Sequence, residues 1–172
     1  MKIISLSENK DIEKRIAITP ETSKKYISAG FDVSLPQGYG DHLGYTDSEY
    51  KSHGVNIVQN EKDLLNSTNI IVQLGLPSDD KLSQFKEKQN LIGILNPFIN
   101  NEKIDNLKKK GINNFSLELL PRITRAQSMD ILSSQANLAG YKAVIESFAH
   151  FEKAIPMMMT AAGTVPAAKV LV

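Results

Sequence analysis

Over its first 120 residues the sequence alternates short apolar runs with amphipathic segments, and this alternation constrains the fold more than any other feature. The apolar runs, which read as strands, lie at residues 2–6, 31–35, 55–58, 69–74, 90–95 and 114–117. The segments between them, which read as helices, lie at residues 20–29, 47–53, 61–65, 79–87 and 102–110. Strands that alternate with helices form parallel sheets through right-handed crossovers. The pattern therefore predicts an α/β fold, a Rossmann-like or flavodoxin-like parallel sheet with helices on both faces.

After residue 120 the pattern changes to one long helix, expected from roughly Ser128 to Ala154. Its larger apolar residues recur at three- and four-residue spacing and predict one buried stripe: Leu138, Tyr141, Ile145 and Phe148. Pro156 would end the helix, and Met157-Met158-Met159 would be packing material in a core. The run at residues 169–172 predicts the start of another strand.

Composition excludes several classes of function. With 20 basic and 19 acidic residues, a net charge of +1 gives no reason to expect nucleic acid as a partner. No apolar run approaches the roughly 18–20 residues that span a bilayer, and no signal-peptide core begins the chain. Cysteine is absent, which fits a reducing compartment, so a soluble cytoplasmic chain is expected. The three histidines do not stand at metal-ligand spacing, so no metal site is predicted.

The segment at residues 121–130 gathers polar groups between the last expected strand and the long helix. It holds Arg122, Arg125, Gln127 and Asp130. Arginine supplies only donors, aspartate only acceptors and glutamine both, so the set could bind an amide or a ribose. Residue types alone leave two interpretations open. The segment is either a binding loop or a solvated loop that ends in a helix N-cap.

Three stretches of the sequence carry a resemblance to a known family. The stretches PRITRAQSMDILSSQANLAGYKAV and PMMMTAAGTVPAAKVLV resemble the NAD(H)-binding component of proton-translocating NAD(P) transhydrogenases. The opening stretch EKRIAITPETSKKYISAGFDV is shared with the related alanine dehydrogenases. The similarity extends from Met1 to the last residue.

This resemblance implies an enzyme that passes a hydride from NADH to NADP⁺, coupled to proton translocation. NADP(H) would be bound by a partner component, and a membrane component would carry the protons. The family also implies a homodimer on the cytoplasmic side, peripheral to the inner membrane. Site residues follow by matching positions: Arg122 for the carboxamide oxygen, Gln127 for the nicotinamide ribose, Asp130 for loop geometry and Ser133 for the carboxamide region. Arg122, Gln127 and Asp130 would also serve catalysis, through positioning.

The resemblance also implies a domain division. Residues 1–120 would form the N-terminal α/β domain, 121–155 a binding loop with a connecting helix, and 156–172 the truncated start of the NAD(H)-binding Rossmann domain. A dinucleotide fold needs its G-x-G-x-x-G turn, and the chain contains none. Gly38-Tyr39-Gly40 lacks the third glycine and is expected to be a turn. The chain is therefore expected to be a fragment that is inactive alone.

Two other functions stay open. In alanine dehydrogenases the arginine matching Arg15 holds the substrate carboxylate, together with a lysine and a histidine. Those two positions align here with Gly75 and Asn96, which cannot relay a proton, so the resemblance favours a transhydrogenase. The third possibility is a non-enzymatic assembly or regulatory module.

Overall fold

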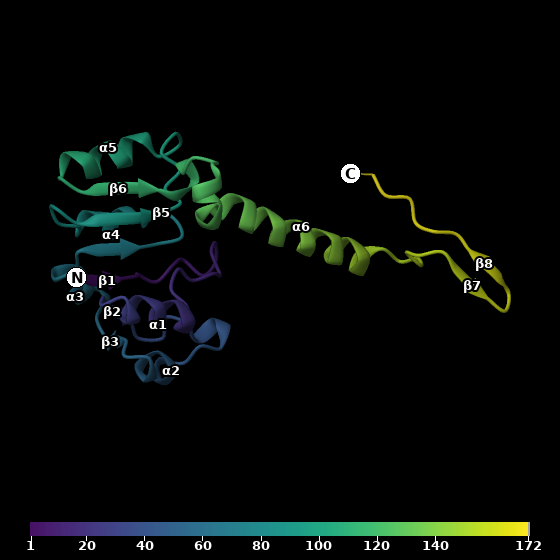
Figure 1. Ribbon diagram of the computed structural model, residues 1–172, viewed down its shortest axis with the longest axis horizontal. Helices are drawn as coiled ribbons and strands as arrows, with labels where there is room; N and C mark the ends of the chain where they lie inside the picture. The colour runs from purple at the N-terminus through teal and green to yellow at the C-terminus, as the bar shows by residue number, and fades with distance from the viewer. Residues whose placement is uncertain (172) are drawn as a thin grey trace. The chain divides into compact units, whose positions relative to one another are not determined.

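In the computed structural model, which describes residues 1–171, six parallel strands form one sheet in the order β3-β2-β1-β4-β5-β6 (Figure 1). The strands are β1 (Lys2–Ile4), β2 (Asp32–Pro36), β3 (Asn56–Val58), β4 (Ile70–Val72), β5 (Asn90–Gly93) and β6 (Asn113–Ser116). This order is that of the doubly wound dinucleotide-binding folds. The predicted Rossmann-like α/β fold is confirmed, and each predicted strand has its counterpart in the sheet.

Helices cover both faces of this sheet. They are α1 (Pro20–Ser28), α2 (Asp47–Ser52), α3 (Glu61–Asn66), α4 (Asp79–Ser83) and α5 (Asn101–Lys109), with short 3-10 turns η1 (Asp41–Leu43) and η2 (Leu117–Leu119). One buried cluster joins α3, α4 and α5 to the sheet, and a second joins α1 and α2 to it. Ile4 of β1 belongs to the first cluster, and its neighbour Ile3 belongs to the second. They lie on opposite faces because successive side chains of a strand point in opposite directions.

The end signals of α1 act as expected. The Thr19 hydroxyl accepts a hydrogen bond from the backbone N–H of Thr22 at 3.2 Å, and Pro20 occupies the first helical position. Gly30 follows the helix with φ +86°, a left-handed conformation that glycine adopts at low cost. Gly38-Tyr39-Gly40 forms a turn, as predicted.

The chain divides into two units, Met1–Pro121 and Arg122–Val172. The second unit contains the 3-10 helix η3 (Thr124–Met129), the helix α6 (Ile131–His150) and two antiparallel strands, β7 (Met158–Thr160) and β8 (Gly163–Val165). The predicted helix at 128–154 is therefore shorter than expected at both ends. Asp130 caps α6 and separates it from η3. Phe151 takes an extended conformation at the C-cap, before Pro156 is reached.

Three expectations about the second unit are wrong. The stripe on α6 is not buried: no residue of the helix is, and Tyr141 is 69% exposed. Burial needs a covering element, and no described residue provides one. Met157, Met158 and Met159 are likewise exposed rather than packed in a core. Residues 169–171 form no strand, because no described segment pairs with them, and Val172 lies outside the described residues.

Candidate functional site

The loop that follows Pro121 is organised by its own backbone. Ile123 is extended, and its carbonyl accepts the backbone N–H of Ala126 at 2.9 Å, which begins η3. Ala126 is buried, whereas Arg122 and Gln127 are exposed. One small residue thus anchors the turn while the polar side chains remain accessible.

Three of the four predicted site residues line one hollow. Arg122, Gln127 and Asp130 surround a space of about 310 Å³ together with Ile123 and Thr124. The hollow lies entirely within the second unit and is formed by consecutive turns of the same segment. The structure therefore places Arg122, Gln127 and Asp130 around one hollow. Ser133, the fourth predicted residue, does not line the hollow.

Ser133 instead holds Asp130. The Asp130 carboxylate accepts the Ser133 backbone N–H at 3.0 Å and the Ser133 hydroxyl at 2.7 Å. These two bonds, first the backbone one, lower the pKa of Asp130, and the nearby positive charge of Arg122 lowers it further. Asp130 is thus an ionised N-cap of α6, where a negative charge favours the helix dipole. The interpretation of the segment as a loop that ends in an N-cap is correct on that point, and the N-cap coexists with the hollow.

The side chains around this hollow combine hydrogen-bond donors with acceptors. Arg122 offers a fixed fork of donors, Gln127 a donor and an acceptor, and Asp130 acceptors. A carboxamide and a ribose both need donors and acceptors together, and the residues present supply both. No His, Cys or Lys of the described chain lines the hollow.

A second cavity lies at the carboxyl ends of β1 and β4, where the strand order reverses. Such switch points are the usual ligand crevices of open α/β sheets. The cavity is about 310 Å³ in volume, and Arg15, Gly75 and Asn96 all line it. The three positions aligned with alanine dehydrogenases therefore share one cavity in this chain.

Arg15 is engaged by a neighbouring carboxylate in this cavity. Its Nε donates to Glu13 Oε1 at 2.8 Å and its Nη2 to Glu13 Oε2 at 2.6 Å. Bidentate pairing of this kind is strong, and the Arg15 bonds lower the pKa of Glu13. The ion pair gives Arg15 a structural role in fixing the first loop.

A buried polar network behind this cavity was not predicted. The Tyr39 hydroxyl donates to Ser5 Oγ at 2.7 Å, and Ser5 donates to Gln73 Oε1 at 3.0 Å. Gln73 Nε2 donates in turn to Glu8 Oε1 at 3.1 Å, and Glu8 also accepts the Leu74 N–H at 2.9 Å. Burial raises the pKa of Glu8 despite these donors. The glutamine directly after the apolar run at 70–72 was the one signal that could have indicated this network.

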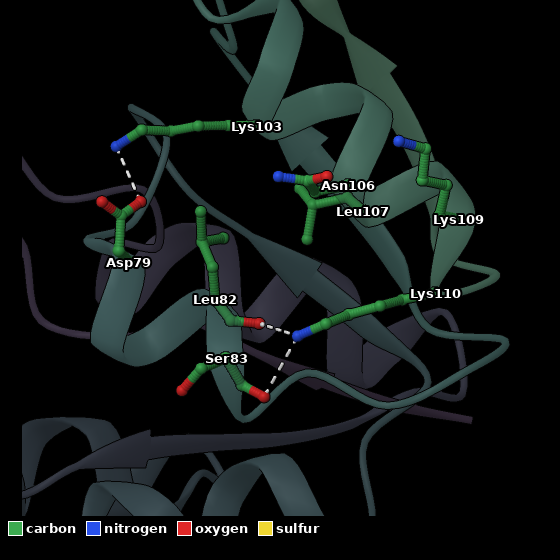
Figure 2. Close-up of a pocket in the computed structure, with 8 residues that line it drawn as sticks. All are labelled: Asp79, Leu82, Ser83, Lys103, Asn106, Leu107, Lys109 and Lys110. Atoms are coloured by element: carbon green, nitrogen blue, oxygen red, sulfur yellow. Dashed lines mark hydrogen bonds and ion pairs between the residues drawn. The ribbon is translucent and has the colours of Figure 1, made fainter.

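A further hollow lies between α4 and α5, about 470 Å³ in volume and remote in sequence from the loop (Figure 2). Two of the lysines that line it bond to other groups of the protein. Lys103 pairs with Asp79 at 2.7 Å, and Lys110 donates to the carbonyls of Leu82 and Ser83 at 3.5 and 3.3 Å. A lysine at the last carbonyls of a helix offsets its dipole. We interpret this hollow as a groove of helix packing.

The described residues contain no group of three His, Cys, Asp or Glu side chains that could hold a metal ion. Among these same residues, no helix combines the length and the hydropathy that crossing a membrane requires. The His42 ring lies within hydrogen-bond distance of the Lys14 carbonyl, and His150 lies 3.7 Å from Glu146.

Known proteins are similar to this chain over its whole length. Residues 5–139 match the family model described as alanine dehydrogenase/PNT, N-terminal domain. An NAD(P) transhydrogenase subunit alpha protein of Rickettsia prowazekii is 42% identical over 176 residues, which cover 100% of this chain and 46% of the relative. The crystal structure of transhydrogenase from Sinorhizobium meliloti superposes with a TM-score of 0.88 at 42% identity, over 96% of this chain and 50% of that one.

An alanine dehydrogenase is a more distant relative. Alanine dehydrogenase 1 of Staphylococcus aureus is 24% identical over 145 residues, which cover 84% of this chain and 38% of that protein. The chain spans about half the length of the transhydrogenase relatives that it matches.

Proposed function

The chain belongs to the alanine dehydrogenase/PNT N-terminal domain family, and we propose that it is the N-terminal portion of the NAD(H)-binding component of a proton-translocating NAD(P) transhydrogenase. The observation that carries this proposal is the hollow lined by Arg122, Gln127 and Asp130. These residues lie in the stretch whose resemblance is to transhydrogenases, and they supply the donors and acceptors that a nicotinamide and its ribose require.

The residues of this loop would orient the nicotinamide end of NAD(H). Arg122 would donate to the carboxamide oxygen, and Gln127 would bind the nicotinamide ribose. Asp130 would set the loop geometry, since it fixes the start of α6 through both Ser133 bonds. Ser133 would thereby act on the carboxamide region through Asp130.

Positioning is the main demand of this reaction. Bound NADH supplies the hydride, and no acid or base on this chain is needed for its transfer. A loop that holds one ring in a near-attack geometry can contribute a large part of the rate. Among the described residues that line the hollow, the ionised Asp130 is the one carboxylate and no other proton carrier of neutral pH is present, which fits that demand.

Partner components complete the proposed enzyme. NADP(H) would be bound by a separate component, and a membrane component would translocate the protons, so the chain would lie peripherally on the cytoplasmic side of the inner membrane. We also propose a homodimer. The exposed apolar residues of α6 and of the methionine segment at 157–159 are a surface that a second copy could cover.

The domain division follows the same proposal. Residues 1–120 would be the N-terminal domain, 121–155 the loop with its connecting helix, and 156–172 the start of the dinucleotide-binding domain. An alanine dehydrogenase-like activity is the second candidate. It is disfavoured because Gly75 and Asn96 line the cavity at the positions where the resemblance places the lysine and the histidine of alanine dehydrogenases, and because Arg15 is paired with Glu13. A purely structural assembly module is the third.

Reconstituted hydride transfer tests the proposal. A polypeptide that joins this sequence to a dinucleotide-binding domain would be mixed with an NADP(H)-binding component, and reduction of an NADP⁺ analogue by NADH would be followed. We expect transfer only when both proteins are present. No transfer in the mixture, or turnover of L-alanine with NAD⁺ instead, would refute the assignment.

A further inference from the structure

The switch-point cavity, at the carboxyl ends of β1 and β4, has the form of a small-molecule site. Its volume of about 310 Å³ lies at the lower end of the roughly 300–1,000 Å³ that is typical of ligand pockets. Its apolar lining includes three half-buried side chains, those of Leu74, Leu76 and Ile94. All of its lining residues belong to the first unit, Met1–Pro121, so this unit alone forms the cavity.

One part of the cavity border has no side chain, and another is fixed by the sheet. A Cβ atom at Gly75 would meet no other heavy atom within 4 Å, so open space lies over this glycine. Asn96 takes a left-handed conformation, with φ +47°, which asparagine tolerates better than most residues. Its backbone N–H donates to Glu118 Oε1 at 2.6 Å, beyond the ends of β5 and β6. The cavity therefore has a fixed border beside an unfilled space.

The carboxylate of Glu8 is held at this cavity by buried neighbours. Its Oε1 accepts Gln73 Nε2 at 3.1 Å and the Leu74 N–H at 2.9 Å. Gln73 is itself oriented by Ser5, whose hydroxyl donates to Gln73 Oε1 and accepts from Tyr39. A carboxylate has about four acceptor sites, so Glu8 keeps the capacity to accept donors from a ligand.

Glu8 is not paired with a cation. None of the ion pairs between described residues includes it. Arg15 lines the same cavity, but its guanidinium bonds to both oxygens of Glu13. Lys81 pairs with Glu61 at 2.9 Å. The lining therefore holds two carboxylates and one guanidinium, and the guanidinium is engaged by the other carboxylate, that of Glu13.

The surroundings of Glu8 favour a bound cation. Burial raises the pKa of its carboxyl, although the N–H groups of Leu74 and Gly75 lower it. The charge of Glu13 raises this pKa further, and the charge of Lys81 lowers it. A partly buried carboxylate attracts a cation more strongly than one in water does, because the effective dielectric constant is lower. A carboxyl with a shifted pKa in a cavity is also a typical feature of binding sites.

We propose that the switch-point cavity binds a small primary ammonium ion, with the Glu8 carboxylate as its counterion. The three N–H donors of the ammonium group would bond to acceptors that line the cavity. Its alkyl chain would lie over Gly75, against the apolar side chains. A ligand carboxylate is not expected to bind, because Glu13 occupies the guanidinium of Arg15. The site does not depend on hydride transfer by the loop at 121–130.

Titration of the 172-residue chain, followed by amide signals in ¹⁵N-resolved NMR spectra, tests this site. The probes are propylammonium, 1-propanol, propionate and L-alanine, each at constant ionic strength and neutral pH. We expect propylammonium to shift the signals of Leu74, Gly75 and Asn96 saturably, with a Kd of about 1–10 mM for a ligand of this size. Neutral 1-propanol and anionic propionate should produce no saturable shift.

Two substitutions act on the site in different ways. Glu8→Gln removes the charge but keeps an oxygen for the Gln73 and Leu74 donors, and it should raise the Kd for propylammonium about tenfold or more. Gly75→Met places a side chain in the open space and should abolish binding while Glu8 is retained. Glu102→Gln, at an exposed glutamate of α5, is the matched control and should bind as the parent does.

Several results would overturn the proposal. One is the absence of a saturable shift with propylammonium up to about 100 mM. Equal Kd values for propylammonium and 1-propanol, or parent affinity in Glu8→Gln, would show that the carboxylate is not the counterion. Tighter binding of propionate or L-alanine than of propylammonium would identify the guanidinium of Arg15 as the recognising group instead. Parent affinity in Gly75→Met would place the bound ammonium ion outside this cavity.

Discussion

Replacing Gln73 with alanine should destabilise the sheet domain, because its side-chain amide links the end of β4 to the end of β1 by hydrogen bonds. The side chain is 3% exposed. Its Oε1 accepts from Ser5 Oγ at 3.0 Å and from the Leu6 N–H at 2.6 Å, and its Nε2 donates to Glu8 at 3.1 Å.

The size of the effect follows from the groups left behind. Truncation leaves two buried donors without an acceptor, the N–H of Leu6 and the hydroxyl of Ser5. Each buried donor without an acceptor costs about 1–3 kcal/mol, so the free energy of unfolding should fall by about 3 kcal/mol. That is a large share of the roughly 5–15 kcal/mol that stabilises a typical domain.

Urea unfolding of the 172-residue chain, followed by far-ultraviolet circular dichroism, measures this loss. Gln59→Ala is the matched control, because Gln59 is exposed and its truncation should change stability by less than about 0.5 kcal/mol. If Gln73→Ala unfolds at the same urea concentration as Gln59→Ala, the buried network does not hold the β1/β4 junction.

Three further predictions concern pH, cofactor and substrate. Burial raises the pKa of Glu8 in the folded chain above its ordinary value of 4.5. The stability that the protonated carboxyl contributes is therefore fully present below pH 4.5 and is lost as the pH rises through the pKa of the folded state. Between pH 4.5 and neutrality the parent should therefore lose unfolding free energy relative to Glu8→Gln in urea titrations, and parallel curves would contradict this. Residues 1–172 alone should bind NADH very weakly, because they contain no glycine-rich turn to hold the pyrophosphate; micromolar affinity by calorimetry would overturn this. A polypeptide that adds the dinucleotide-binding domain should not deaminate L-alanine in a steady-state assay, since Gly75 and Asn96 supply no proton relay; clear turnover would reverse the assignment.

Local signals explain why so much of the sheet could be predicted. Thr19, Pro20 and Gly30 mark the two ends of α1 through capping chemistry that acts over a few residues. The run at 70–72 is apolar at every position because strands of a parallel sheet are covered on both faces. The loop hollow was also foreseeable, because Arg122, Gln127 and Asp130 are close neighbours in sequence.

The features that could not be predicted from the sequence depend on contacts between residues that are far apart in the chain. Glu118 and Asn96 are 22 residues apart, and nothing in their local sequence indicates the bond between them. The hairpin of β7 and β8 had one local signal, Gly163 at φ +127° after two alanines, but the methionine run before it resembled core. The stripe on α6 was predicted as buried because periodicity reports which face is apolar, not whether anything covers it.

The most direct test of the account compares rate with affinity in loop variants. Arg122→Ala, Gln127→Ala and Asp130→Asn would be assayed for single-turnover hydride transfer from NADH to an NADP⁺ analogue, with the NADP(H)-binding component added and the dinucleotide-binding domain present. The account predicts that transfer slows by on the order of a hundredfold while the Kd for NADH changes little, because ring placement depends on the loop and the remaining contacts do not. Hydride transfer at the parent rate in all three variants would show that the segment is only a connector between the sheet and α6.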